Sequence, residues 1–123
     1  MNGLYLKIYL LEKRRVHGLL AYEWLLEQAR GMGVHGGTAF RAIAGFGRHG
    51  ALHEEHFFEL AGDLPVEVGF CCGEAEAERL LALVEREGVP CFHVTLAARF
   101  GEVTARERET SGENSERSKK PEK

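Results

Sequence analysis

A glycine-rich run at residues 45–50, Gly-Phe-Gly-Arg-His-Gly, is the segment of this sequence best suited to hold an anion. Glycines let backbone N–H groups approach an anion closely, and a guanidinium can hold phosphate oxygens. The run lacks the Gly-Lys-Ser or Gly-Lys-Thr of a Walker loop, and a tight turn that needs positive φ angles is the alternative interpretation. The candidate ligand-binding residues of the run are Gly45, Gly47, Arg48, His49 and Gly50.

Arg41 is the sixth candidate ligand-binding residue, because it is a charge within an otherwise apolar segment. A charge in such a place is either paired across an interface or directed at a ligand. The sequence leaves both roles open.

Three histidines lie within eight residues: His49 inside the glycine-rich run, then His53 and His56, with Glu54 and Glu55 between the last two. Imidazole and carboxylate groups together suit zinc, nickel or copper, so these histidines are candidate metal ligands. The spacing differs from HExxH by one residue, and a solvated polar loop is the alternative interpretation.

The sequence offers no grouping of residues that indicates catalysis. No Ser-His-Asp set, activated Cys-His pair or isolated carboxylate pair can be recognised, so we expect a protein that is not an enzyme. The net charge of -3 and the pI near 6.1 do not favour nucleic acid as a partner. Three cysteines without a CxxC motif, and the lack of a long apolar run, predict a cytoplasmic protein that does not insert into membranes.

The elements that must position these residues follow from hydrophobic periodicity. Apolar residues alternate at a period of two over residues 4–11, which predicts a strand. Spacings of three and four predict a helix over residues 19–32. Residues 35–47 are apolar on both faces, which predicts a strand buried on both sides, and residues 47–56 read as a loop.

The second half of the sequence repeats this order. Alternation predicts a strand over residues 64–70. Residues 74–87 have the clearest helical spacing in the chain, and residues 89–98 alternate again as a last strand. We expect residues 1–100 to form one domain and residues 101–123, which are nearly all charged or polar, to be a disordered tail.

The order βαββαβ with short connections predicts an α+β, ferredoxin-like fold: a four-stranded antiparallel sheet with two helices on one face. The other face of the sheet then has no element to cover it. Another copy of the same chain is the simplest cover, although the sequence pattern does not choose between two and three copies.

Residues 36–50, GGTAFRAIAGFGRHG, are followed by Leu52-His53 and later by Leu64-Pro65-Val66. With the opening Gly3-Leu4 and the stretch from His17-Gly18 to Tyr22-Glu23, they make residues 3–98 resemble a prokaryotic family catalogued as domain of unknown function 190.

The resemblance implies a ferredoxin-like homotrimer similar to PII signalling proteins, with its sheets facing the threefold axis. It also implies a ligand, since PII proteins bind adenine nucleotides between subunits and signal to protein targets through the loop after the second strand. The leading hypothesis is therefore a PII-like regulatory protein that binds a small anionic effector, such as an adenine nucleotide, and has an unidentified protein target. The alternatives are a protein that binds a divalent metal and a structural adaptor without a ligand.

Overall fold

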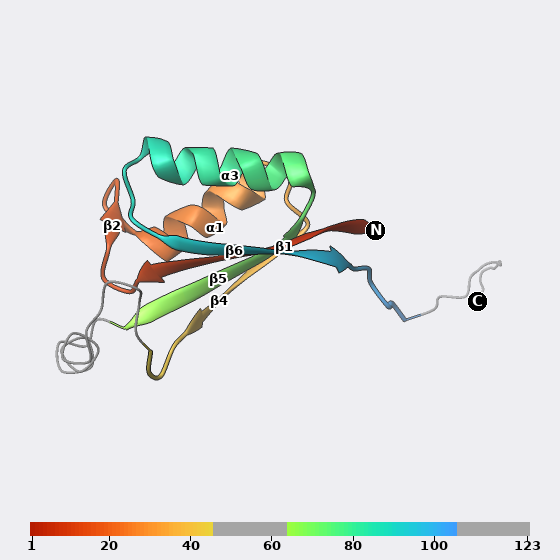
Figure 1. Ribbon diagram of the computed structural model, residues 1–123, viewed down its shortest axis with the longest axis horizontal. Helices are drawn as coiled ribbons and strands as arrows, with labels where there is room; N and C mark the ends of the chain where they lie inside the picture. The colour runs from red at the N-terminus through yellow and green to blue at the C-terminus, as the bar shows by residue number, and fades with distance from the viewer. Residues whose placement is uncertain (46–63, 106–123) are drawn as a thin grey trace.

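A computed structural model describes residues 1–45 and 64–105 of the chain. Four strands form one antiparallel sheet in the order β4-β5-β1-β6. Their bounds are Asn2–Leu11 for β1, Gly36–Arg41 for β4, Pro65–Cys72 for β5 and Phe92–Arg99 for β6. This strand order and the α+β class confirm the predicted ferredoxin-like fold (Figure 1).

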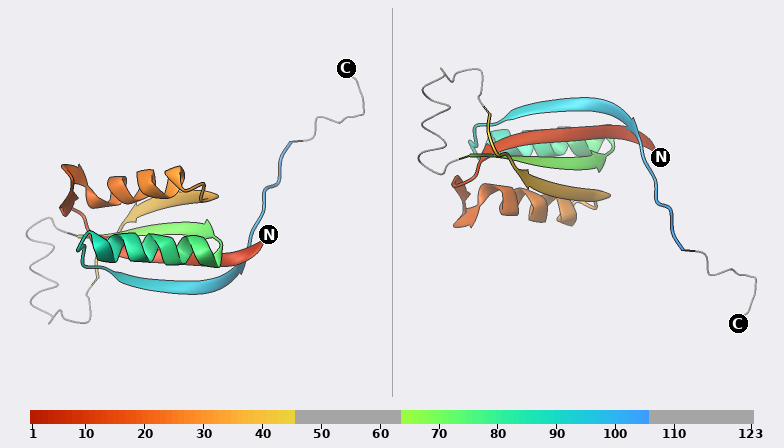
Figure 2. Two further views of the ribbon diagram at one scale, coloured as in Figure 1. Left: turned by 90° about the horizontal axis from the view of Figure 1, so that it is seen from above. Right: turned by 90° about the horizontal axis from the view of Figure 1, so that it is seen from below.

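Two helices, α1 at Ala21–Gly31 and α3 at Glu74–Arg86, lie side by side on one face of the sheet. Figure 2 shows them in front of the sheet in one view and behind it in the opposite view. No described element covers the other face. Within residues 1–45 and 64–105, the sheet therefore has one buried face and one open face.

The core lies between the helices and the two central strands. Every second residue of β1 and β5 points into it, as the period of two requires. The largest fully buried side chains are those of Leu6, Ile8, Leu25, Val68, Phe70, Cys72 and Leu80. Burial of side chains of this size contributes about 1.5 to 3 kcal/mol each before the entropy of ordering is subtracted.

Local hydrogen bonds cap the end of α1 and the start of α3. Gly33 adopts φ +81°, which only glycine reaches at low cost, and this turn lets the Val34 N–H donate to the Ala29 carbonyl at 3.1 Å. At the start of α3 the Glu76 carboxylate accepts from the Gly73 N–H at 2.9 Å. The predicted second helix is thus confirmed almost to the residue.

The first helix begins two residues later than predicted. Leu19–Leu20 form a short strand, β3, which pairs with β2 at Arg15–Val16 in a hairpin that the periodicity did not indicate. His17 and Gly18 make its turn, and both have positive φ. Turn chemistry thus outweighs the helical spacing of Leu19, because the turn sets the chain direction before the helix can begin.

The second strand is shorter and more exposed than predicted. β4 ends at Arg41 rather than at residue 47, and residues 46 and 47 lie outside the described part of the chain. The prediction of a strand buried on both sides is wrong for the single chain, where only Ala39 is partly buried. The reason is its position, since β4 is an edge strand and half of its side chains lie on the open face.

The last strand starts at Phe92, three residues after the predicted start, because Val89 and Pro90 complete the turn that follows α3. Of the predicted tail, residues 101–105 are exposed and have no regular structure, and residues 106–123 lie outside the described residues. Within the described ranges, no helix is long and apolar enough to cross a bilayer.

Candidate functional site

The structure describes two of the six candidate ligand residues, Arg41 and Gly45. The other four, Gly47, Arg48, His49 and Gly50, lie outside the described residues. His53 and His56 of the proposed metal set lie outside them as well, so the anion and metal hypotheses remain predictions.

Arg41 ends β4 and forms an ion pair with Glu12, which directly follows β1. Both its Nε and its Nη2 donate to Glu12 Oε2, at 2.8 and 2.5 Å. This hydrogen bonding lowers the pKa of the Glu12 carboxyl, and the carboxylate in turn raises the pKa of Arg41. The pair joins the ends of β4 and β1.

The chain beyond Arg41 stays beside β5 for at least one more residue, because the Ala42 N–H donates to the Pro65 carbonyl at 2.9 Å. Ile43 then projects into solvent with 93 % of its surface exposed. An exposed isoleucine next to a guanidinium places apolar and charged groups together at this corner of the sheet. Either a ligand or a second chain could cover such a corner.

The described part of the chain contains no group of three or more metal-ligating side chains. His17 contacts Glu87 at 3.0 Å, and His35 contacts Glu102 at 3.7 Å. Each of these contacts supplies only two candidate ligands.

The open face of the sheet has a defined set of side chains, because residues paired across antiparallel strands point to the same side. Along each strand, residues that enter the core alternate with residues that point to the open face, away from the helices. The open face includes Tyr5, Lys7, Tyr9, Thr38, Phe40, Glu67, Gly69, Cys71, Phe92, Val94 and Leu96. Phe40, Phe92 and Leu96 are 56, 59 and 49 % exposed, which is a large apolar exposure for one face.

Aromatic rings flatten this open face. A Cβ added at Gly69 would lie 2.1 Å from the Tyr5 hydroxyl oxygen, so the Tyr5 side chain lies directly over the Gly69 backbone. The rings of Tyr9 and Phe92 contact each other with centroids 6.1 Å apart. Tyrosine rings lying along the sheet expose apolar surface rather than projecting into solvent.

One ion pair lies among these rings, between Lys7 Nζ and Glu67 Oε2 at 4.0 Å. Partial burial, followed by the charge of Glu67 and a hydrogen bond to it, raises the pKa of Tyr9. The open face therefore combines apolar area with a small polar network at its centre. The cores of subunit interfaces are enriched in aromatic residues, as this face is, although charged residues are usually depleted there.

The two adjacent cysteines point to opposite faces, as their position on a strand predicts. Cys72 is buried among core side chains, and this burial raises the pKa of its thiol. Cys71 is half-buried on the open face, and all three cysteines are free thiols. A raised pKa disfavours the reactive thiolate, so Cys72 acts as a core residue.

Comparisons with known proteins agree with this fold. The model of the family DUF190, described as "Uncharacterized ACR, COG1993", matches residues 3–96. The chain belongs to the DUF190 family.

Two similar proteins support the assignment. A UPF0166 protein of Aquifex aeolicus (strain VF5) is 37 % identical over 76 residues, which cover 62 % of this chain and 72 % of the relative. A crystal structure from Thermus thermophilus, of a protein described as PII-like and signalling, superposes with a TM-score of 0.50. It shares 17 % sequence identity, and the match covers 80 % of this chain and 90 % of the other. This second similarity shows that the DUF190 protein shares its fold with that protein.

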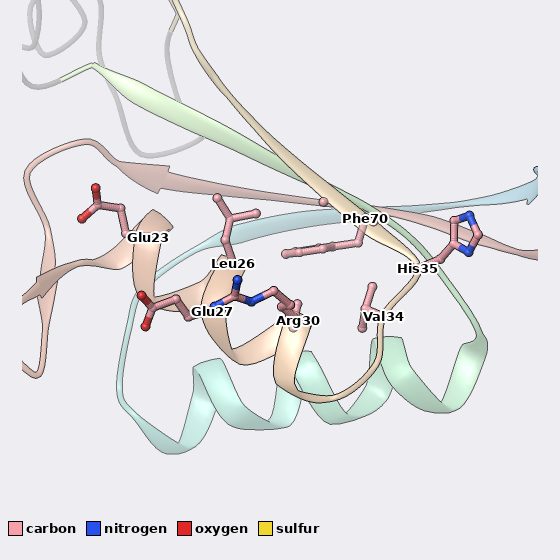
Figure 3. Close-up of a pocket in the computed structure, with 10 residues that line it drawn as sticks. Glu23, Leu26, Glu27, Arg30, Val34, His35 and Phe70 are labelled. Atoms are coloured by element: carbon pink, nitrogen blue, oxygen red, sulfur yellow. The ribbon is translucent and has the colours of Figure 1, made fainter. Parts of the chain in front are cut away.

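The DUF190 chain has a further feature that the sequence pattern did not single out, a groove between α1 and β4 of about 660 Å³ (Figure 3). Leu26, Val34 and Phe70 form its floor, and the backbone of Gly36 and Gly37 forms one wall. Glu23, Glu27 and Arg30 line the other side. The sequence does contain a signal for this groove, because positions 23, 26, 27 and 30 lie on one face of a helix.

Proposed function

We propose that this DUF190 member is a PII-like regulatory protein, not an enzyme, which acts in the cytoplasm as a homotrimer. The single observation that carries the proposal is the open face of the sheet, with Phe40, Phe92 and Leu96 about half exposed. Burial of such a face removes apolar surface from water, and another copy of the chain presents the same apolar face. The PII-like fold and the family resemblance favour three copies over two.

The proposal places the ligand site at the boundary between subunits. Phe40 lies on the open face, and the next residue, Arg41, lies at the end of the edge strand. A second chain that covers Phe40 therefore comes close to Arg41 and to the glycine-rich run beyond it. The ligand site is proposed to use Arg41, Gly45, Gly47, Arg48, His49 and Gly50, and its ligand is a small anion such as an adenine nucleotide.

The first test is the oligomeric state of the full chain. Light scattering at about 10 μM protein should give three times the mass of one chain. A monomer at this concentration would contradict both the proposed homotrimer and the proposed ligand site between subunits.

The second test is calorimetry with ATP, ADP, AMP and cyclic nucleotides. Arg48→Ala should weaken binding about 10-fold to 100-fold, because a charge-assisted contact is worth about 1.5 to 3 kcal/mol. The matched control is Arg99→Ala, since Arg99 ends β6 at the opposite end of the sheet. If no nucleotide binds the wild type below about 1 mM, the glycines have only a turn-forming role.

A further inference from the structure

The outer edge of β4 carries backbone groups that no strand of the described chain pairs with, since β4 is the first strand in the sheet order. The Ala42 N–H donates to the Pro65 carbonyl, so Ala42 and Pro65 form a hydrogen-bonded pair. Alternation along an antiparallel ladder then directs the N–H and C=O groups of Gly37, Ala39 and Arg41 away from β5. Three donors and three acceptors therefore face outward in a row.

This edge borders the groove beside α1. Positions 37, 39 and 41 face the helix side of the sheet, which is the side of the groove. The three outward backbone pairs and the groove thus form one continuous surface. Because Gly36 and Gly37 have no side chains, an incoming backbone meets no obstacle at that end of the edge.

We infer that the groove between α1 and the free edge of β4 binds an extended peptide segment of a partner protein, which adds a strand to the sheet. Addition of a strand supplies affinity through backbone hydrogen bonds, and pockets for alternate side chains supply specificity. Each residue of the peptide that pairs with Gly37, Ala39 or Arg41 directs its side chain toward α1. The peptide's other residues lie on the open-face side, next to Thr38 and Phe40.

The charged side chains that line the groove indicate which charged residues a bound peptide would carry. Glu23, Glu27 and Arg30 form no ion pair or side-chain hydrogen bond with any described residue. In Figure 3, the Glu23 and Glu27 carboxylates lie on one side of Arg30 along the groove, and Val34 lies on the other side. The two carboxylates would attract a basic residue, and the guanidinium an acidic one.

The spacing of these charges also fits a strand. The centre of the Glu23 and Glu27 pair is about five residues, or roughly 7.5 Å, from Arg30 along the helix. Two residues of an extended strand span about 6.6 Å. Because α1 and β4 are consecutive elements that run in opposite directions, a strand antiparallel to β4 runs with α1, so its basic residue precedes its acidic residue by two positions.

This surface meets the open face of the proposed assembly only along β4, where the peptide would lie next to Thr38 and Phe40. The groove lies on the helix side of the sheet, whereas Phe40, Phe92 and Leu96 lie on the opposite side. Light scattering with and without peptide reports the assembly, whereas amide shifts report peptide binding, so failure of one proposal is distinguishable from failure of the other.

The test uses the full chain labelled with ¹⁵N and the blocked hexapeptide acetyl-Thr-Val-Lys-Val-Glu-Val-amide. We expect saturable binding below about 1 mM, with the largest amide shifts at Gly37, Ala39 and Arg41. A peptide with Lys and Glu exchanged should bind about 5-fold to 10-fold more weakly, since two attractions become repulsions. Methylation of the Lys backbone nitrogen should abolish binding, while methylation of the following Val nitrogen, which points away from β4, should not.

A matched pair of variants tests the charge. Arg30→Glu should weaken binding of the Lys-Val-Glu peptide about 5-fold to 10-fold, whereas Arg79→Glu, on the exposed surface of α3, should not. Equal affinity for both peptides, or no shift at millimolar concentration, would overturn the inference. Slow hydrogen exchange at Ala39 and Arg41 in the protein without peptide would also overturn it, since another copy of the chain would then occupy the edge.

Discussion

At the scale of single residues, the open face depends on a glycine and a tyrosine. Gly69 has no side chain, and the space that a Cβ would occupy is taken by the Tyr5 ring. Tyr5 therefore lies flat across β5 instead of standing away from the sheet. A flat aromatic surface allows two sheets to approach closely, so this pair is the most specific residue-scale feature of the proposed interface.

Substitution of Gly69 tests that role. Gly69→Ala should displace Tyr5, because the added methyl group would lie 2.1 Å from its hydroxyl oxygen. We expect the chain to fold and the concentration at which the oligomer dissociates to rise at least about 10-fold. Analytical ultracentrifugation measures the change. Gly36→Ala is the control, since Gly36 lies on the same side of the sheet and an added Cβ there meets nothing within 4 Å; an equal effect of both variants would contradict the role of Tyr5.

The pair of Glu12 and Arg41 should make stability depend on pH. Because Arg41 lowers the pKa of Glu12 in the folded state, its contribution is present above the unfolded pKa, near 4.5, and is lost as pH falls through the lower folded value. Urea midpoints of wild type and Glu12→Gln should therefore differ at about pH 6, and the difference should shrink as pH falls below the unfolded pKa. Glu85→Gln, at an exposed position of α3, serves as the control. A difference that persists at low pH would show that the pair acts through packing rather than charge.

At the scale of elements, both edge strands expose apolar side chains. β6 presents Phe92 and Leu96 on the open face, and β4 presents Phe40. Exposed edges usually carry charges that prevent association, and these strands carry few. The two edges of the sheet are thus suited to contact another chain, whereas the helices complete the core of a single chain.

A charge introduced on the open face of β6 should prevent assembly without preventing folding. Leu96→Glu should convert the oligomer to monomers, because an unpaired carboxylate would have to be buried in the interface. Ala97→Glu places the same charge on the next residue, which is exposed and faces the helix side of the sheet. Light scattering at about 10 μM, with circular dichroism to confirm folding, should show a loss of mass only for Leu96→Glu. An intact oligomer in that variant would place the interface elsewhere.

At the scale of the whole molecule, the folded domain closes on itself near Phe100. The N-terminal ammonium of Met1 donates to the Phe100 carbonyl at 2.7 Å, and the Phe100 N–H donates to the Met1 carbonyl at 2.9 Å. The ring of Phe100 also contacts His35 with centroids 5.4 Å apart. These contacts tie the end of β6 to the start of β1 and to the start of β4.

A chain that ends at Gly101 should therefore keep its melting temperature within about 2 °C of the full-length protein. The described contact beyond that point, between His35 and Glu102, is exposed, and exposed ion pairs contribute little to stability. Differential scanning calorimetry of the two chains makes the comparison. Loss of several degrees would mean that residues 102–123 pack against the domain. A chain ending at Leu96, which lacks the Phe100 contacts, is the destabilised reference.

The sequence alone determined the class of the fold and most of its elements. Alternation at a period of two in β1 and β5, and the spacing of Ala77, Leu80 and Val84 in α3, are local signals, because each arises from residues that are near one another in the chain. The sequence also indicated that one face of the sheet would be uncovered. These predictions are correct because the buried face of a strand or helix requires apolar residues at the period of that element.

The features that depend on strand order could be learned only from the tertiary structure. The sequence marked β4 as a buried strand, since its apolar residues cannot report that the strand lies at an edge. The pairing of Arg41 with Glu12, the position of Tyr5 over Gly69 and the groove beside α1 likewise join residues far apart in the chain. Periodicity describes which side of its own element a residue faces, whereas these contacts depend on which elements become neighbours when the sheet assembles.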